Sequence, residues 1–104
     1  MDQEEVLYRA IVGKMTQEFP EVNEGKMMSA PGIRFKTKVF AFYYEHSMTF
    51  RLGKGVDLKP MGITEWKHLS PFKNKPAMTG WYIIDDSYSE HWEKLAYQAL
   101  GTMV

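Results

Sequence analysis

Between Gly32 and Leu52 the sequence alternates in steps of two residues, and this pattern constrains the fold more than any other feature. The run Gly32-Ile-Arg-Phe-Lys-Thr-Lys-Val-Phe-Ala-Phe-Tyr-Tyr is followed by Met48-Thr-Phe-Arg-Leu, and Met78-Thr-Gly-Trp-Tyr-Ile-Ile adds another extended segment. A period of two is typical of strands with one buried face. From Trp92 onward the apolar spacing changes to three and four, which indicates a helix. This order predicts an antiparallel sheet closed by a C-terminal helix.

Two turns set the register that we expect. A turn at Lys36-Thr37 would pair Ile33 with Phe40, and a loop at 45–47 would pair Tyr44 with Met48. One face of the sheet then forms the core, and it carries Ile33, Phe35, Phe40, Phe42, Tyr44, Met48, Phe50 and Leu52. The opposite, semi-polar face carries Arg34, Val39, Ala41, Tyr43, Thr49 and Arg51. For the last strand, either Trp81 and Ile83 or Met78, Tyr82 and Ile84 face the core.

Two amphipathic helices flank the expected sheet. Asp2 with Glu5 is typical of a helix N-terminus, and an apolar stripe at helical spacing continues to Phe19 before Pro20. Ser87 with Glu90 predicts a capping box for the C-terminal helix. Residues 63–69 are expected to form two helical turns, and Phe72 to anchor the return of the chain. We therefore predict one α+β domain over residues 1–104: an antiparallel sheet of four or five strands, with the N- and C-terminal helices packed on one face.

Composition excludes several classes of protein. The chain has 104 residues and no cysteine, so disulfides, thiolate catalysis and cysteine-based zinc sites are ruled out. No apolar run approaches the roughly 20 residues that a membrane span needs. The acidic start, Met1-Asp-Gln-Glu-Glu, is unlike a signal peptide. We expect a cytoplasmic protein that does not associate with membranes.

The net charge of zero conceals a basic centre. Residues 32–75 hold nine basic and three acidic residues, a net charge of +6, whereas the segments on either side each carry −3. The centre could face an anionic partner, or the acidic ends could neutralise it within the fold. We favour neutralisation, because strong nucleic-acid binders keep an overall basic balance.

No motif indicates a reaction or a bound ion. His46, His68 and His91 lack the spacing of a metal-binding helix, and we expect surface or structural roles for them. The pair Asp85-Asp86 and the nearby serines are better explained as helix caps than as catalytic groups. We predict no catalytic residue, no cofactor and no metal site. The best binding surface would be the semi-polar sheet face, at Arg34, Tyr43, Thr49 and Arg51.

The ordered set of motifs resembles the N-terminal domain of the TfoX (Sxy) competence-regulator family, within the wider TfoX/YjbR-like group. The matching pieces follow the family's order: Met28, Gly32-Ile33, Lys38-Val-Phe-Ala, Met48-Thr-Phe-Arg-Leu, Phe72, Met78-Thr-Gly-Trp and Trp92-Glu-Lys-Leu-Ala-Tyr-Gln-Ala. The turn at Lys36-Thr37 departs from the glycine turn of that family, and Thr79-Gly80 replaces a charged pair. The resemblance implies an α+β domain with little assigned chemistry. Full-length relatives regulate competence genes and carry a second domain.

These observations favour a non-enzymatic interaction or regulatory module of a bacterial cytosol, binding another protein or a second copy of itself. A nucleic-acid-binding accessory protein that uses the basic centre is the first alternative. An enzyme of unknown reaction is the second.

Overall fold

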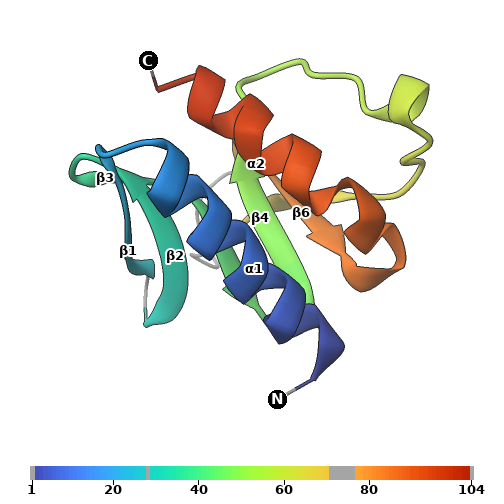
Figure 1. The fold of residues 1–104 in the computed structure, drawn as a ribbon. Coiled ribbons are helices and arrows are strands. Elements are labelled where there is room, and N and C mark those ends of the chain that lie inside the picture. Colours follow the sequence, from blue (N-terminus) through green and yellow to red (C-terminus); the bar gives the residue numbers. More distant parts are fainter. Residues whose placement is uncertain (1, 28, 71–76, 104) are drawn as a thin grey trace.

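The computed structural model describes residues 2–27, 29–70 and 77–103. It has an α+β fold in which two α-helices accompany a six-stranded antiparallel sheet with the strand order β1-β2-β3-β4-β6-β5 (Figure 1). In chain order the elements are α1 Gln3–Glu18, β1 Val22–Met27, β2 Ala30–Phe35, β3 Lys38–Tyr44, β4 Ser47–Arg51, a 3₁₀ turn Lys59–Met61, β5 Lys67–Leu69, β6 Met78–Asp85, a 3₁₀ segment Asp86–His91 and α2 Trp92–Gly101.

The predicted α+β class is confirmed, whereas the predicted strand count is wrong. The segment after α1 forms the edge strand β1, whose sequence has little apolar alternation and gave only a weak strand signal. Residues 67–69 pair with β6 as the short strand β5 instead of forming a helical turn. Phe72 and Met28 lie outside the described residues.

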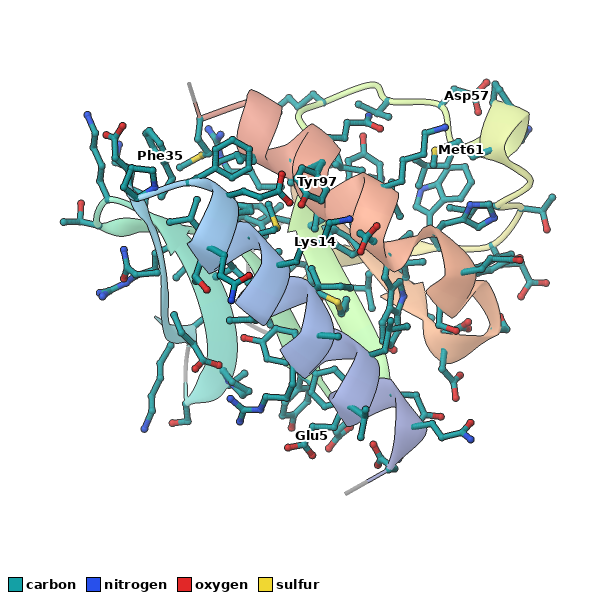
Figure 2. All side chains as sticks on the ribbon, in the orientation of Figure 1. Glu5, Lys14, Phe35, Asp57, Met61 and Tyr97 are labelled. Carbon is teal, nitrogen blue, oxygen red and sulfur yellow. The ribbon has the colours of Figure 1, made fainter. Side chains whose placement is uncertain are left out.

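Both helices pack on one face of the sheet, here called the inner face (Figure 1). Their buried side chains join those of the strands in one core. The largest fully buried members are Trp92, Tyr8, Tyr82, Phe40, Phe50, Ile11, Met15, Ile33, Met48, Leu58, Ile63 and Ile84. Figure 2 shows Lys14 and Tyr97 where the two helices meet, and there Lys14 Nζ lies 3.3 Å from a Glu93 carboxylate oxygen. An exposed ion pair thus bridges the two helices above the apolar core that they share.

The predicted cap of α1 is confirmed, because Asp2 Oδ1 accepts a hydrogen bond from the Glu5 amide at 3.1 Å. The predicted capping box before α2 is wrong. Asp85 instead caps the 3₁₀ segment by accepting from the Ser87 amide at 3.0 Å, and α2 itself begins only at Trp92.

A β-bulge at Phe40 changes which residues face the core. The turn pairs Phe35 with Lys38 as predicted, but Ile33 pairs with Ala41 while Arg34 pairs with Val39, which leaves Phe40 as an extra residue. Phe40 and Ala41 are consequently both fully buried on the inner face.

From this point on, the alternation of β3 is the reverse of the prediction. Tyr43 lies in the main core with 8% of its surface exposed, whereas Phe42 joins a second cluster and Tyr44 is 58% exposed. The next turn has two residues rather than three, so Tyr44 pairs with Ser47 and Phe42 with Thr49. Assigning Phe42 and Tyr44 to the core and Ala41 and Tyr43 to the opposite face was therefore wrong.

The register also orients the last strand. Tyr82 and Ile84 belong to the main core, and Trp81 and Ile83 belong to the second cluster on the other side of the sheet. The sequence left two alternatives for this strand. The alternative in which Tyr82 and Ile84 face the core is confirmed for these two residues. Met78 is exposed.

Candidate functional site

The face of the sheet opposite the helices, here called the outer face, carries its own apolar cluster. Ala30, Phe42 and Leu69 are buried there, and the partly exposed side chains of Met27, Val39, Trp81 and Ile83 pack around them. The Trp81 and Phe42 rings lie 6.0 Å apart between centroids. The apolar cluster holds Trp81 in place while leaving part of it accessible.

Two hollows adjoin at Arg51 and Trp81, where the outer-face cluster meets the residues that follow α2. The larger, of about 600 Å³, is lined by Met27, Thr37, Lys38, Val39, Arg51, Trp81, Thr102 and Met103. The smaller, of about 490 Å³, is lined by Arg51, Gly53, Lys54, Met78, Thr79, Gly80, Trp81 and Thr102. Because they share Arg51, Trp81 and Thr102, we treat them as one candidate site, the Arg51–Trp81 hollow. Each volume lies within the range of about 300–1,000 Å³ that is common for ligand sites.

The lining of the Arg51–Trp81 hollow is cationic. Lys38, Arg51 and Lys54 line it, and no Asp or Glu is among its lining residues in the described part of the chain. Two smaller hollows elsewhere differ, because one contains Glu65 and Asp85 and the other contains Glu24. The basic centre predicted from the sequence thus contributes three cations to one concave surface.

The end of α2 positions the arginine. Arg51 Nη1 donates to Thr102 Oγ1 at 3.2 Å and lies 3.3 Å from the Met103 sulfur. These contacts occupy one guanidinium nitrogen, while a guanidinium carries five N–H donors in all. A side chain that is already held in place loses less conformational entropy when it binds a partner.

The four residues predicted as a binding face do not share one surface. Arg51 lines the Arg51–Trp81 hollow. Arg34 has its Nε donating to Asn23 Oδ1 at 2.7 Å and is not among the hollow's lining residues. Thr49 pairs with Phe42 but is only 3% exposed. Tyr43 lies on the inner face, where its ring stacks on Tyr8 at 5.6 Å. The premise that these four residues lie together is wrong for Tyr43, because of the bulge at Phe40.

Lys38, Lys54 and Trp81 were not among the residues predicted for the binding face. The orientation of Trp81 depends on the pairing of β6 with β4, which local alternation does not specify. Lys38 follows a turn and Lys54 follows a strand, so nothing in their local sequence marks them as neighbours of Trp81. The excess of positive charge in residues 32–75 was the one available signal.

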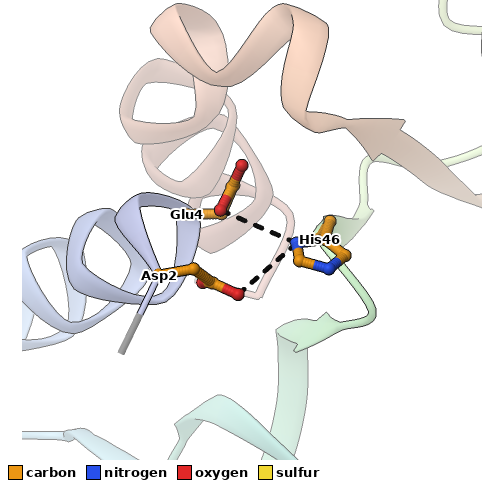
Figure 3. Close-up of side chains that lie close together, drawn as sticks. All are labelled: Asp2, Glu4 and His46. Carbon is orange, nitrogen blue, oxygen red and sulfur yellow. Dashed lines mark ion pairs between the residues drawn. The ribbon is translucent and has the colours of Figure 1, made fainter.

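The three histidines lie in different surroundings. His68 Nδ1 is 3.3 Å from the Trp81 carbonyl oxygen, and its ring packs against Tyr82. His91 is near Glu90. His46 lies between two carboxylates, with its Nδ1 3.5 Å from Asp2 Oδ2 and 3.6 Å from Glu4 Oε2 (Figure 3).

Hydrogen bonding, burial and charge around Asp2 shift the pKa values of two groups beside this histidine. The hydrogen bond from the Glu5 amide, together with the nearby His46, lowers the pKa of Asp2. Burial first, and then the charge of Asp2, raise the pKa of Tyr43. Asp2 is therefore favoured as a carboxylate and Tyr43 as a neutral hydrogen-bond donor.

Comparisons of the chain with protein families, with curated proteins and with solved structures gave no match. Among the described helices, none is long and apolar enough to cross a membrane.

Proposed function

We propose that this protein is a non-enzymatic interaction module that binds an acidic segment of a partner protein in the Arg51–Trp81 hollow. The observation that carries the proposal is that Lys38 and Arg51 line one hollow, Arg51 and Lys54 line the adjoining one, and the described lining of both has no carboxylate. Complementary charge steers encounter and selects partners, and an arginine can bind a carboxylate with two parallel hydrogen bonds.

The apolar part of the lining favours a protein partner. Met27, Val39, Met78, Trp81 and Met103 lie beside the cations. Methionine side chains adapt to irregular apolar surfaces, and tryptophan and arginine are enriched among the residues that contribute most to protein interfaces. A segment with alternating acidic and apolar residues would match both kinds of lining.

The regulatory and bacterial parts of the proposal rest on the resemblance to the TfoX N-terminal domain. The α+β fold is compatible with that resemblance. A cytosolic setting agrees with the absence of cysteine from the sequence. We include a regulatory role in a bacterial cytosol in the proposal on these grounds.

Charge reversal at the hollow tests the proposal. Immobilised wild-type protein, the double variant Lys38→Glu/Lys54→Glu and the control Lys94→Glu would be exposed to the same bacterial lysate. All three lysines are exposed, and Lys94 lies on α2 and does not line the hollow. We expect that some lysate proteins bind to wild type and to Lys94→Glu but not to the double variant. When purified, these proteins should bind wild type through acidic segments. The same set of bound proteins for all three baits would exclude the hollow as the binding surface.

Single-stranded nucleic acid is the second candidate ligand, and it is favoured by one observation. A partly accessible tryptophan lies beside three cations. In proteins that bind single strands, bases stack on such aromatic rings while nearby cations contact the phosphate backbone. Binding of oligothymidine that weakens steeply with salt, together with loss in the Lys38→Glu/Lys54→Glu variant, would replace the acidic-segment proposal with this one.

A further inference from the structure

Three potential metal ligands from distant parts of the chain meet beside the N-terminus of α1. Asp2 and Glu4 lie at the start of α1, and His46 lies in the turn between β3 and β4 (Figure 3). One ligand atom from each lies within 4.8 Å of the other two.

Two of the three distances among these ligand atoms match a zinc coordination shell. Zinc binds imidazole nitrogen and carboxylate oxygen at about 2.0–2.2 Å in a tetrahedral arrangement, so neighbouring ligand atoms are about 3.3–3.6 Å apart. His46 Nδ1 lies 3.5 Å from Asp2 Oδ2 and 3.6 Å from Glu4 Oε2. The two distances from the His46 nitrogen to the carboxylate oxygens therefore already have the length that zinc coordination requires.

Neighbouring groups orient the Asp2 carboxylate toward His46. Its Oδ1 accepts from the Glu5 amide at 3.1 Å and from the Tyr43 hydroxyl at 3.4 Å, which leaves Oδ2 to face the imidazole. Tyr43 is itself fixed, since it is buried and stacked on Tyr8. Carboxylates that ligate metals are commonly held by such outer hydrogen bonds, and losing one weakens metal affinity about 10- to 100-fold.

We propose that Asp2, Glu4 and His46 form a zinc-binding site, with water completing the coordination of the ion. The nitrogen ligand favours zinc over magnesium and calcium, which prefer shells made of oxygen. A zinc ion here would join the first turn of α1 to the turn between β3 and β4. The proposal is independent of the Arg51–Trp81 hollow, because none of its three ligands lines that hollow.

Isothermal titration of tag-free protein with zinc chloride tests the site. The variants are His46→Gln and Glu4→Gln, with His91→Gln as the control, because His91 lies next to Glu90 and outside the cluster. Asp2 is left intact because it caps α1. We expect one zinc ion per wild-type chain, unchanged binding by His91→Gln, and affinity reduced at least about tenfold in the other two variants.

A second measurement distinguishes a site formed by the fold from adventitious binding. An ion that binds the folded chain in preference to the unfolded chain raises the midpoint of thermal unfolding. Zinc should raise that midpoint for wild type and His91→Gln but not for His46→Gln, and magnesium at the same concentration should have no effect. Equal zinc affinity and equal thermal shifts in wild type and His46→Gln, or no zinc binding by the wild type, would overturn the proposal.

Discussion

Adjacent tyrosines in β3 offer a sharp test of the bulge at Phe40. Tyr43 is 8% exposed in the main core and Tyr44 is 58% exposed, although strict alternation would place Tyr44 inside and Tyr43 outside. Replacing each by alanine should therefore have very different effects on the free energy of unfolding. A register without the bulge predicts the opposite order.

The expected cost at Tyr43 follows from its surroundings. A buried aromatic side chain removes about 200 Å² from water, and at about 25 cal/mol per Å² this gives an upper bound near 5 kcal/mol. Tyr43 also stacks on Tyr8 at 5.6 Å and meets Trp92 edge-on at 6.3 Å. Core aromatic-to-alanine replacements cost about 3–5 kcal/mol, so we expect Tyr43→Ala to fall in that range. Tyr44→Ala should cost about 1 kcal/mol or less, as exposed positions usually do.

Urea unfolding followed by circular dichroism measures both values, because small single domains generally unfold in two states with a linear dependence on denaturant. If Tyr43→Ala is too unstable to measure, Tyr43→Phe removes only the hydroxyl that donates to Asp2. That change should cost about 0.5–1.5 kcal/mol. A larger loss for Tyr44→Ala than for Tyr43→Ala would refute the bulge and the division of the sheet into inner and outer faces.

Two glycines and one tyrosine give further predictions. Gly13→Ala in α1 should stabilise the protein by up to about 1 kcal/mol, because nothing lies within 4 Å of the added Cβ. Gly32→Ala should destabilise it by about 1–3 kcal/mol in the same urea assay, since the Cβ would lie 3.0 Å from the Ala41 carbonyl oxygen. Stabilisation by Gly32→Ala would contradict the close pairing of β2 with β3. Partial burial and the hydrogen bond to Glu18 raise the pKa of Tyr97 to about 12 from 10.0. Its folded pKa is the higher one, so its contribution to stability is complete below pH 10 and is lost as the pH rises toward 12. Wild type should lose more stability than Tyr97→Phe over that interval, and identical losses would contradict the raised pKa.

The sequence was most informative where one local signal determines the structure. The Asp2 cap depends on neighbours within one helical turn and was predicted correctly, and the apolar spacing placed α1 correctly although Val6 is exposed. The Lys36-Thr37 turn was found because polar residues interrupt the alternation there. The α+β class followed from the order of segments with a period of two residues and segments with helical spacing.

The prediction failed where non-local pairing decides the structure. Val39 to Tyr44 has no polar residue to mark its faces, so a bulge that reverses the alternation left no trace in the sequence. β1 and β5 are edge strands whose own sequences have weak strand character. Their pairing with β2 and β6 stabilises the extended conformation.

The same limit applied to the candidate site. Arg51 was identified from its position on a strand, whereas Lys38, Lys54 and Trp81 join it only through the assembled sheet and its turns. His46 was assigned to the surface, and it is exposed, but its approach to Asp2 and Glu4 joins segments more than 40 residues apart in the sequence. Sequence spacing alone does not reveal such neighbours.

The indole N–H signals of the three tryptophans provide the most direct test of the Arg51–Trp81 hollow. Trp92 is fully buried and its Nε1 donates to the Ile84 carbonyl oxygen at 3.2 Å, so its signal serves as an internal control, and Trp66 lines a different hollow. The ¹H–¹⁵N spectrum would be recorded during titration with a peptide that alternates glutamate and leucine, and with the matched glutamine–leucine peptide. The proposal predicts that the acidic peptide shifts the Trp81 indole signal and the Arg51 amide while the Trp92 signal stays in place, and that the glutamine peptide has little effect. Unchanged Trp81 and Arg51 signals, or equal shifts with both peptides, would contradict the proposal that this hollow binds acidic partners.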